Sequence, residues 1–346
     1  MTRTGFFSHA HLPLLRGVSR SFYLTIRLLP AALRAPIAVA YLLARATDTV
    51  ADTTALGAQD REHLLSALTA SIQAANGQLQ GPPHQVATFA AQQSDPHERA
   101  LMLALPECLA LLQGLPQPDQ DSVRWVLGHI ADGQMRDVNR FGHGLASLAS
   151  ETELDEYTWL VAGCVGEFWT ELCVRHLPGF ATEPAQGMRQ LGRAYGMGLQ
   201  RLNILRDAGA DLAAGRCYLP DSLLKPLGLD PQTLWQAVHN GDLQALAPLQ
   251  PLWQEQLALT QAQLADGLRY SLALNSRRLR LATALPALLG ARTVALLAQA
   301  GPMALSRQVK MPRSEVRSLL LRLLLTGVSR RSLAREFARL SEPVQG

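Results

Sequence analysis

Apolar residues recur along most of this chain at intervals of three and four, and they do not alternate with polar residues over any sustained stretch. Such spacing places them on one face of an α-helix. Clusters of Gly and Pro separate the periodic stretches, and the polar stretch 77–93 is expected to be an exposed loop. The pattern therefore predicts an all-α fold of roughly ten helices. We expect them at residues 31–51, 60–75, 97–112, 118–141, 154–176, 184–211, 231–238, 252–272, 282–300 and 314–340, the last broken near Gly327.

The composition is that of a folded globular protein. Of the 346 residues, 48% are hydrophobic and 17% are charged, which excludes a disordered or collagen-like chain. The four cysteines form no Cys-x-x-Cys pair, so we expect reduced thiols rather than a disulfide framework. No uninterrupted apolar run of about 18 residues occurs, and the first residues lack the apolar stretch of a signal peptide. We therefore expect a cytoplasmic protein without a transmembrane helix.

The net charge of +4 is unevenly distributed along the chain. From Gly301 onward there are nine basic and three acidic residues, whereas the rest is close to neutral. We predict a main helical bundle at 1–300 and a basic, leucine-rich helical segment at 301–346 packed on it. Such a segment is typical of peripheral contact with a membrane, here the inner membrane, or with a partner protein, but also of an amphipathic helix that closes a bundle. Arginine-rich usage is equally an effect of genome composition, so no nucleic-acid contact is predicted.

One predicted helix, 36–52, is apolar almost all round, which implies burial, yet it carries four polar residues. They are four, three and four residues apart and so form one stripe: Tyr41, Arg45, Asp48 and Asp52. A buried, unpaired carboxylate costs several kcal/mol, and two carboxylates at i and i+4 repel each other. We therefore expect a positive partner in front of Asp48 and Asp52.

A second helix, 197–211, repeats the arrangement. Its polar residues are three, four and four apart and again form one stripe: Gln200, Asn203, Asp207 and Asp211. Two otherwise apolar helices that each carry an Asp-x-x-x-Asp stripe are stronger evidence than either helix alone. The alternative for each stripe is a solvent-exposed helix face with capping aspartates.

The ligands offered by the two stripes are oxygen atoms, which favours a hard cation such as Mg²⁺ over zinc. Mg²⁺ is commonly shared between one or two carboxylates and the phosphates of a substrate. Arginines, which match phosphate oxygens with two parallel hydrogen bonds, occur in or near the same segments. They are Arg20, Arg45, Arg206 and Arg216. The two stripes therefore predict a magnesium-dependent diphosphate site. Motifs for an EF-hand, a dinucleotide fold, a P-loop, a serine hydrolase or a zinc protease are absent from the sequence.

Five sequence blocks that span most of the chain resemble the squalene/phytoene synthase family of head-to-head prenyl synthases. They are SRSFYLTIRLLP at 19–30, YLLARATDTVAD at 41–52, YTWLVAGCVGEF at 157–168, LQRLNILRDAGADLAAGRCYLP at 199–220 and VKMPR at 309–313. The spacing between the first two blocks and the Asp-Thr pair in the second are most similar to squalene synthases. The Val-Lys-x-x-Arg pattern of the last block points the same way.

The resemblance implies an isoprenoid-synthase-type helical bundle with a central cavity, formed by residues 1–300. It implies two molecules of farnesyl diphosphate as substrate, NADPH as cofactor and about three Mg²⁺ ions, which suits the oxygen ligands. The first half-reaction would join the two substrates head-to-head into presqualene diphosphate. The second would ionise this intermediate, rearrange its ring and quench the cation with hydride from NADPH to give squalene.

The resemblance also implies roles for individual residues. The metal ligands are Asp48, Asp52, Asn203, Asp207 and Asp211. Tyr157 is implied as a catalytic acid/base or cation stabiliser, alongside the four aspartates. Lys310 and Arg313 are implied at the NADPH site. The residues implied to grip diphosphate or shape its pocket are Ser19, Arg20, Ser21, Tyr41, Arg45, Gln200, Asn203, Arg206 and Arg216.

Two alternatives stay open at this point. A related head-to-head synthase would release presqualene diphosphate, hydroxysqualene, dehydrosqualene or phytoene. A catalytically inactive member of the family would serve as a membrane-associated assembly factor, although such a protein is expected to have lost metal ligands. The sequence leaves the oligomeric state open.

Overall fold

The computed structural model describes residues 11–18, 26–53, 55–79, 83–326 and 328–342 of the chain. It divides into two compact units. Unit 1 comprises residues 1–142 and 171–178, and unit 2 comprises residues 143–170 and 179–346. The described part is helical apart from short turns and one pair of two-residue strands, which confirms the predicted all-α class. The division predicted at residue 300 stays a prediction, and segment 301–346 belongs to unit 2.

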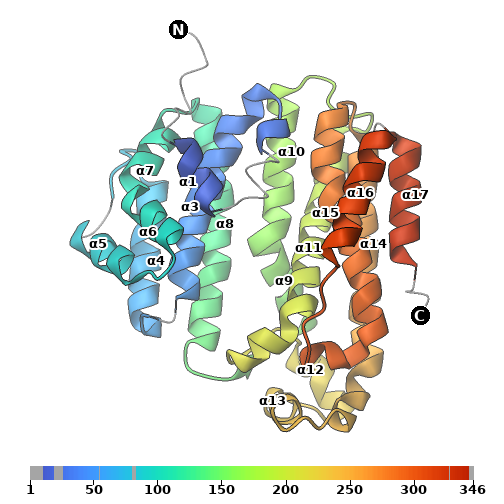
Figure 1. Cartoon of the computed structure of the whole chain (residues 1–346). Coiled ribbons are helices and arrows are strands. Elements are labelled where there is room, and N and C mark those ends of the chain that lie inside the picture. Colours follow the sequence, from blue (N-terminus) through green and yellow to red (C-terminus); the bar gives the residue numbers. More distant parts are fainter. Residues whose placement is uncertain (1–10, 19–25, 54, 80–82, 327, 343–346) are drawn as a thin grey trace. The chain divides into compact units, whose positions relative to one another are not determined.

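Unit 1 is built around the long helix α3. One face of α3 is buried, with Leu42, Leu43 and Val50 fully enclosed. Helix α8 packs along α3, and α4 packs against both. Helices α6 and α7 contact α3, and α5 packs on α6 (Figure 1). The helices of unit 1 are α1 (His11–Val18), α3 (Ala31–Asp52), α4 (Ala58–Gln73), α5 (Pro83–Gln92), α6 (Pro96–Leu103), α7 (Leu105–Gln113) and α8 (Gln117–Phe141).

Unit 2 has its core where α11, α14 and α15 pack together around the fully buried Trp253. In Figure 1 these helices run side by side, in yellow-green and orange. Helix α10 belongs to unit 2 up to Thr170 and to unit 1 from Glu171. The longer elements are α9 (Glu151–Thr158), the π-helix η1 (Trp159–Gly163), α10 (Cys164–His176), α11 (Ala185–Ala213), α13 (Pro231–Asn240), α14 (Gln250–Ala273), α15 (Arg277–Ala300), α16 (Arg313–Leu325) and α17 (Arg330–Ser341). The shorter ones are β1 (Ala146–Ser147), β2 (Arg216–Cys217), α12 (Asp221–Leu224), η2 (Lys225–Leu227), η3 (Gln244–Leu249) and η4 (Gly301–Leu305).

Glycines let the segment η1–α10 pack directly against α11. A Cβ atom on Gly166 would lie 1.9 Å from the backbone oxygen of Gly192, and one on Gly196 would lie 2.2 Å from that of Ala162. Because no side chain fits between the two backbones, these glycines fix how closely the helices approach. The structure thus assigns these two glycines to helix packing.

The structure corrects two boundaries predicted from the periodicity. The stretch 97–112 forms two helices, because the chain turns at Ala104, which has φ −88° and ψ 7°, and Pro106 starts the second helix. The stretch 77–93, predicted as a loop, contains α5, whose Phe89 and Ala90 are buried. Two apolar contacts therefore outweigh the polar composition of that segment.

One helical stretch, Arg277–Leu305, is long and apolar enough to cross a membrane by length and composition. It is α15 with η4, and half of its most apolar window is buried inside the structure. Leu279, Leu288 and Leu297 are fully enclosed in the core of unit 2. Packing of α15 on α11, α14 and α17 therefore accounts for its apolar character.

Candidate functional site

The first aspartate stripe lies on a single face of α3 in unit 1. Tyr41, Arg45 and Asp48 are partly buried and Asp52 is exposed, whereas the residues between them pack into the core. The spacing of four, three and four residues thus places the four side chains on one face of the helix, as helix geometry requires. Asp52 is the last residue of α3, so the stripe ends where the helix ends.

Asp48 has the most perturbed carboxyl group of this face. Burial and the charge of Asp52 raise the pKa of Asp48 to about 6, although Arg45 and a hydrogen bond from Gln134 act in the opposite direction. The side-chain nitrogen of Gln134, on α8, donates to Asp48 Oδ1. Arg45 is held by an ion pair with Glu98 on α6, so its charge is shared between two acids. The surroundings of Asp48 therefore disfavour its ionised form unless a further positive charge is nearby.

The residues around Asp48 fit a magnesium ion. The side-chain oxygen of Gln134 is buried and has no hydrogen-bond partner, while the nitrogen of the same amide faces Asp48, so rotation of this amide would add a third oxygen ligand to the two carboxylates. Such a set suits Mg²⁺, which prefers oxygen ligands and keeps coordination positions for water and phosphate. No group of three or more His, Cys, Asp or Glu side chains suitable for a metal occurs within the described ranges. A Mg²⁺ ion here would thus take its further ligands from water or substrate.

The second aspartate stripe lies on α11 in unit 2, and its acids are paired with arginines. Arg206 donates to both carboxylate oxygens of Asp207, at 2.9 and 2.5 Å, and this pairing raises the pKa of Arg206. Arg216 donates to Asp211 Oδ1 from Nε at 3.1 Å and from Nη2 at 2.8 Å. Both carboxylates are therefore paired with an arginine.

The amides of the second stripe lie one turn earlier on α11. The Asn203 side chain donates to Gln200 Oε1 at 3.5 Å, and both side chains are partly buried. Leu202, Ile204 and Leu205 on the other faces are buried. The spacing predicted this separation of polar and apolar faces, and the structure confirms it.

A short parallel pairing of strands brings Arg216 back to α11. After α11 the chain turns at Gly215, whose φ of +84° favours glycine, and β2 then pairs with β1, with Arg216 opposite Ala146. Asp221 continues the connection, because its backbone nitrogen donates to the oxygen of Leu148 at 2.8 Å. The pairing fixes the loop that carries Arg216, and this explains how a residue outside the helix meets Asp211.

Tyr157 is stacked on a second tyrosine, Tyr218, which is not among the predicted site residues. The rings of Tyr157 and Tyr218 are 5.1 Å apart at 24°, and their hydroxyl oxygens are 3.4 Å apart. Tyr157 lies in the last turn of α9, which ends at Thr158 just before the π-helix η1, and π-helical turns are frequent at functional sites. Arg201, only 2% exposed, holds α9 on α11 and α14 through Asp155 and Gln256.

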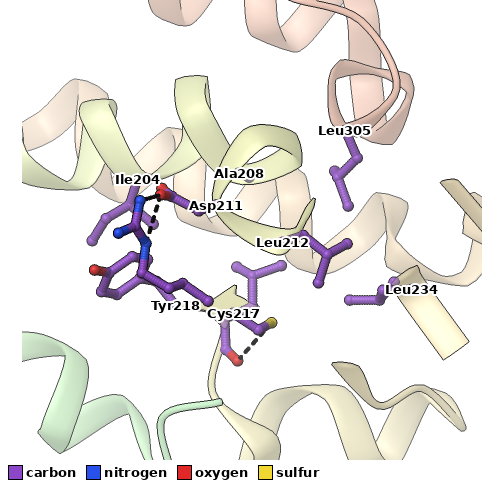
Figure 2. A pocket seen from close by; sticks show the side chains of 10 residues that line it. Ile204, Ala208, Asp211, Leu212, Cys217, Tyr218, Leu234 and Leu305 are labelled. Carbon is purple, nitrogen blue, oxygen red and sulfur yellow. Dashed lines mark hydrogen bonds and ion pairs between the residues drawn. The ribbon is translucent and has the colours of Figure 1, made fainter. Parts of the chain in front are cut away.

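A narrow, mainly apolar pocket of unit 2 opens beside Asp211 and Arg216. Figure 2 shows Asp211 at one end with Tyr218 near it, and Arg216, which pairs with Asp211, also lines the pocket. The apolar lining comes from several elements, namely Ile204, Ala208, Leu212, Leu219, Leu234 and Leu305. Ionic and apolar side chains thus meet at this place in unit 2.

The other predicted residues lie as follows. Lys310 and Arg313 are exposed on the stretch from η4 to α16. This stretch follows Leu305, whose backbone oxygen would lie 1.9 Å from a Cβ on Gly209, between the aspartates of α11. Ser19, Arg20 and Ser21 lie outside the described residues. They follow Val18 directly, and the Val18 oxygen accepts a hydrogen bond from the Tyr41 hydroxyl at 3.5 Å.

Sequence reasoning missed Gln134, Tyr218 and the Arg45–Glu98 pair. The glutamine lies in an amphipathic helix with no motif around it, so its contact with Asp48 arises only from the packing of α8 on α3. Tyr218 lies two residues after Arg216, inside the block 199–220 that carries the family resemblance. This position is the sequence feature from which Tyr218 could have been predicted.

Comparison of the sequence with known proteins identifies the family to which it is similar. The profile of the squalene/phytoene synthase family matches residues 15–315. A bifunctional lycopene cyclase/phytoene synthase of Podospora anserina is 28% identical over 222 residues, which are 63% of this chain and 36% of the relative. Squalene synthase of Saccharomyces cerevisiae is 27% identical over 210 residues, 61% of this chain and 45% of the relative. The chain thus spans less than half the length of these two relatives.

Solved structures show the same fold. The structure of TcSQS with the ligand E5700 aligns with a TM-score of 0.76 at 18% identity and covers 98% of this chain and 90% of that chain. Squalene synthase HpnC from Alicyclobacillus acidocaldarius aligns with a TM-score of 0.59 at 20% identity and covers 87% of this chain and 98% of that chain. These similarities confirm the predicted isoprenoid-synthase-type helical fold.

Proposed function

This chain belongs to the squalene/phytoene synthase family of head-to-head isoprenoid synthases, and we propose that it is a squalene synthase. It would condense two farnesyl diphosphates to presqualene diphosphate and reduce this intermediate with NADPH to squalene. The observation that carries the proposal is the repeated Asp-x-x-x-Asp stripe on α3 and α11, with an oxygen donor or an arginine beside the aspartates. A diphosphate leaving group needs this combination of charges.

On α3, Asp48 and Asp52 would hold Mg²⁺ together with Gln134, and on α11 Asn203, Asp207 and Asp211 would do so. The bound ion supplies charge that stabilises diphosphate as it departs. Asp48 is the residue whose charge most depends on a cation, because burial and its neighbour oppose ionisation. Oxygen ligands of this type favour Mg²⁺ over softer metals.

The arginines of α11 and β2 would change partners during binding. Arg206 and Arg216 neutralise Asp207 and Asp211 in the structure. If Asp207 and Asp211 held a cation, Arg206 and Arg216 would be free to donate two parallel hydrogen bonds each to phosphate oxygens. The same two arginines thus keep the acids neutralised before binding and hold the diphosphate afterwards.

Tyr157 and Tyr218 would stabilise the carbocation that remains after diphosphate leaves. The face of an aromatic ring attracts a cation, and two stacked rings offer this face on a mostly buried surface. The nearby hydroxyls are 3.4 Å apart, close enough to share a proton through a small adjustment. Arg201 and Asp155 would act as positioning residues, because their ion pair holds α9, the helix that carries Tyr157.

Lys310 and Arg313 would bind NADPH through its phosphates. No carboxylate pairs with either side chain among the described residues, so both charges are available to an anionic ligand. NADPH supplies the hydride of the second half-reaction. The role of the two basic residues is to hold the cofactor in place.

A product assay tests the proposal. Purified protein is incubated with labelled farnesyl diphosphate and Mg²⁺, with and without NADPH, and the hydrocarbon is identified by mass spectrometry. We expect squalene only when NADPH is present, and loss of turnover on chelation of Mg²⁺. Asp48→Asn and Asp207→Asn are expected to abolish turnover with unchanged circular dichroism, whereas Asp121→Asn, 64% exposed on α8, is expected to keep it. Full turnover in both active-site variants would contradict the metal role.

Phytoene is the second candidate product, because a matched relative is named a bifunctional lycopene cyclase/phytoene synthase. Incubation with geranylgeranyl diphosphate distinguishes the two, since phytoene would then form without NADPH. Release of presqualene diphosphate, hydroxysqualene or dehydrosqualene would place the chain at an earlier or diverted step. Absence of any turnover with either substrate would favour the non-catalytic assembly role.

A further inference from the structure

Helix α16 is apolar on the face that points away from the protein. Leu319 and Leu323 are buried in the core of unit 2, which accounts for its inner face. The outer face carries leucines that are 58%, 70% and 78% exposed, namely Leu321, Leu324 and Leu325. Together with Leu320 they are four of the nine exposed large hydrophobic residues identified among the described residues. A helix that is apolar on both faces is expected to be covered on both.

Exposed arginines lie on the same helix as these leucines and on the next one. Arg317 is exposed one turn before Leu321 on the same helix. Helix α17 follows after a short turn and is tied to α16 by Arg322 and Glu336, whose Nε–Oε1 distance is 3.0 Å (Figure 1). Its Arg331 and Arg335 are exposed.

Two of the three acidic side chains of α16 and α17 are paired with arginines, and the third, Glu342, lies at the C-terminal end of α17. Glu315 pairs with Arg292 at 2.7 Å, and Glu336 pairs with both Arg322 and Arg339. Among the described residues, no carboxylate pairs with Arg317, Arg331 or Arg335. The surface around the leucines is therefore positive as well as apolar.

We propose that Leu320, Leu321, Leu324 and Leu325 of α16 insert into the surface of an anionic lipid bilayer, while the arginines of α16 and α17 contact its headgroups. An exposed apolar face next to cationic side chains is the combination that binds helices to anionic membranes. A purely apolar face would suit a second copy of the chain equally well, but unpaired arginines at its border would repel the same arginines of a copy. The inference does not rest on the proposed reaction.

Vesicle binding of the full chain tests the proposal. We expect the protein to sediment with vesicles that contain phosphatidylglycerol at low salt, and less so at high salt or with phosphatidylcholine alone. The variant Leu321→Gln/Leu324→Gln/Leu325→Gln removes apolar surface but keeps good helix formers, and we expect its partitioning to fall at least about tenfold. The matched control is Leu103→Gln, a leucine 60% exposed on α6, which is expected to bind like the wild type.

Two further measurements separate the outcomes. In Leu324→Trp, the added tryptophan fluorescence should be quenched by brominated lipids, which shows insertion directly. Arg331→Glu/Arg335→Glu should lower binding to anionic vesicles with unchanged thermal unfolding. Failure of the wild type to bind anionic vesicles overturns the proposal, as does an equal loss in Leu103→Gln. A wild-type dimer that the triple leucine variant converts to monomer, with vesicle binding unchanged, also overturns it and assigns the face to self-association.

Discussion

Asp48→Asn should change how the stability of the metal-free protein depends on pH. The asparagine is uncharged at every pH and keeps an oxygen that can accept the hydrogen bond from Gln134. In the unfolded chain the Asp48 carboxyl has its ordinary pKa of 3.8, whereas in the folded protein burial and Asp52 raise it to about 6. Between these values the folded state binds a proton that the unfolded chain has released.

The sign of the effect follows from the raised pKa. The stability contributed by this proton is fully present below pH 3.8 and is lost as the pH rises through about 6. A shift of about 2 pKa units corresponds to about 3 kcal/mol. Relative to Asp48→Asn, the wild type should therefore lose up to about 3 kcal/mol of unfolding free energy between about pH 4 and pH 7.

The assay is urea denaturation in chelator at a series of pH values. The wild type, Asp48→Asn and the exposed control Asp121→Asn are compared, and the control is expected to follow the wild type. Saturating Mg²⁺ should reduce the difference at pH 7, because a bound cation stabilises the ionised carboxylate. If the unfolding free energies of the wild type and Asp48→Asn changed in parallel with pH in the absence of metal, the idea that the fold destabilises the ionised Asp48 carboxylate would be refuted.

Four other variants test separate parts of the structure. Gly166→Ala should destabilise the protein by about 2 kcal/mol or more in thermal unfolding, because a Cβ would lie 1.9 Å from the α11 backbone. Gly187→Ala, where nothing lies within 4 Å, should leave stability unchanged or raise it by up to about 1 kcal/mol. Arg216→Lys should raise the KM for the diphosphate substrate about tenfold, because the lysine cannot make two parallel hydrogen bonds; an unchanged KM would contradict partner exchange. Tyr218→Phe keeps the ring stack, so a kcat within about threefold of the wild type is expected if the ring face stabilises the cation, and a loss of about a hundredfold would assign the role to the hydroxyl.

Periodicity predicted most helices well, and its errors have a physical origin. The long helices α3, α8, α11, α14 and α15 were predicted to within a few residues, because burial of one face requires the three- and four-residue spacing. The amphipathic helix α5 and the division between α6 and α7 were missed. In these places the pattern is weak, and the outcome depends on contacts with neighbouring helices rather than on the local sequence.

The chain's own sequence determined that it is all-α and that two helices each carry aspartates on one face, because helix geometry converts residue spacing into direction. Tertiary structure alone decided which partners those aspartates meet. Gln134 reaches Asp48 from a helix more than eighty positions away, Arg216 reaches Asp211 through a strand pairing with Ala146, and Tyr218 stacks on Tyr157 from the same loop. Contacts between residues far apart in sequence depend on how elements pack, and spacing within one element carries no information about that packing.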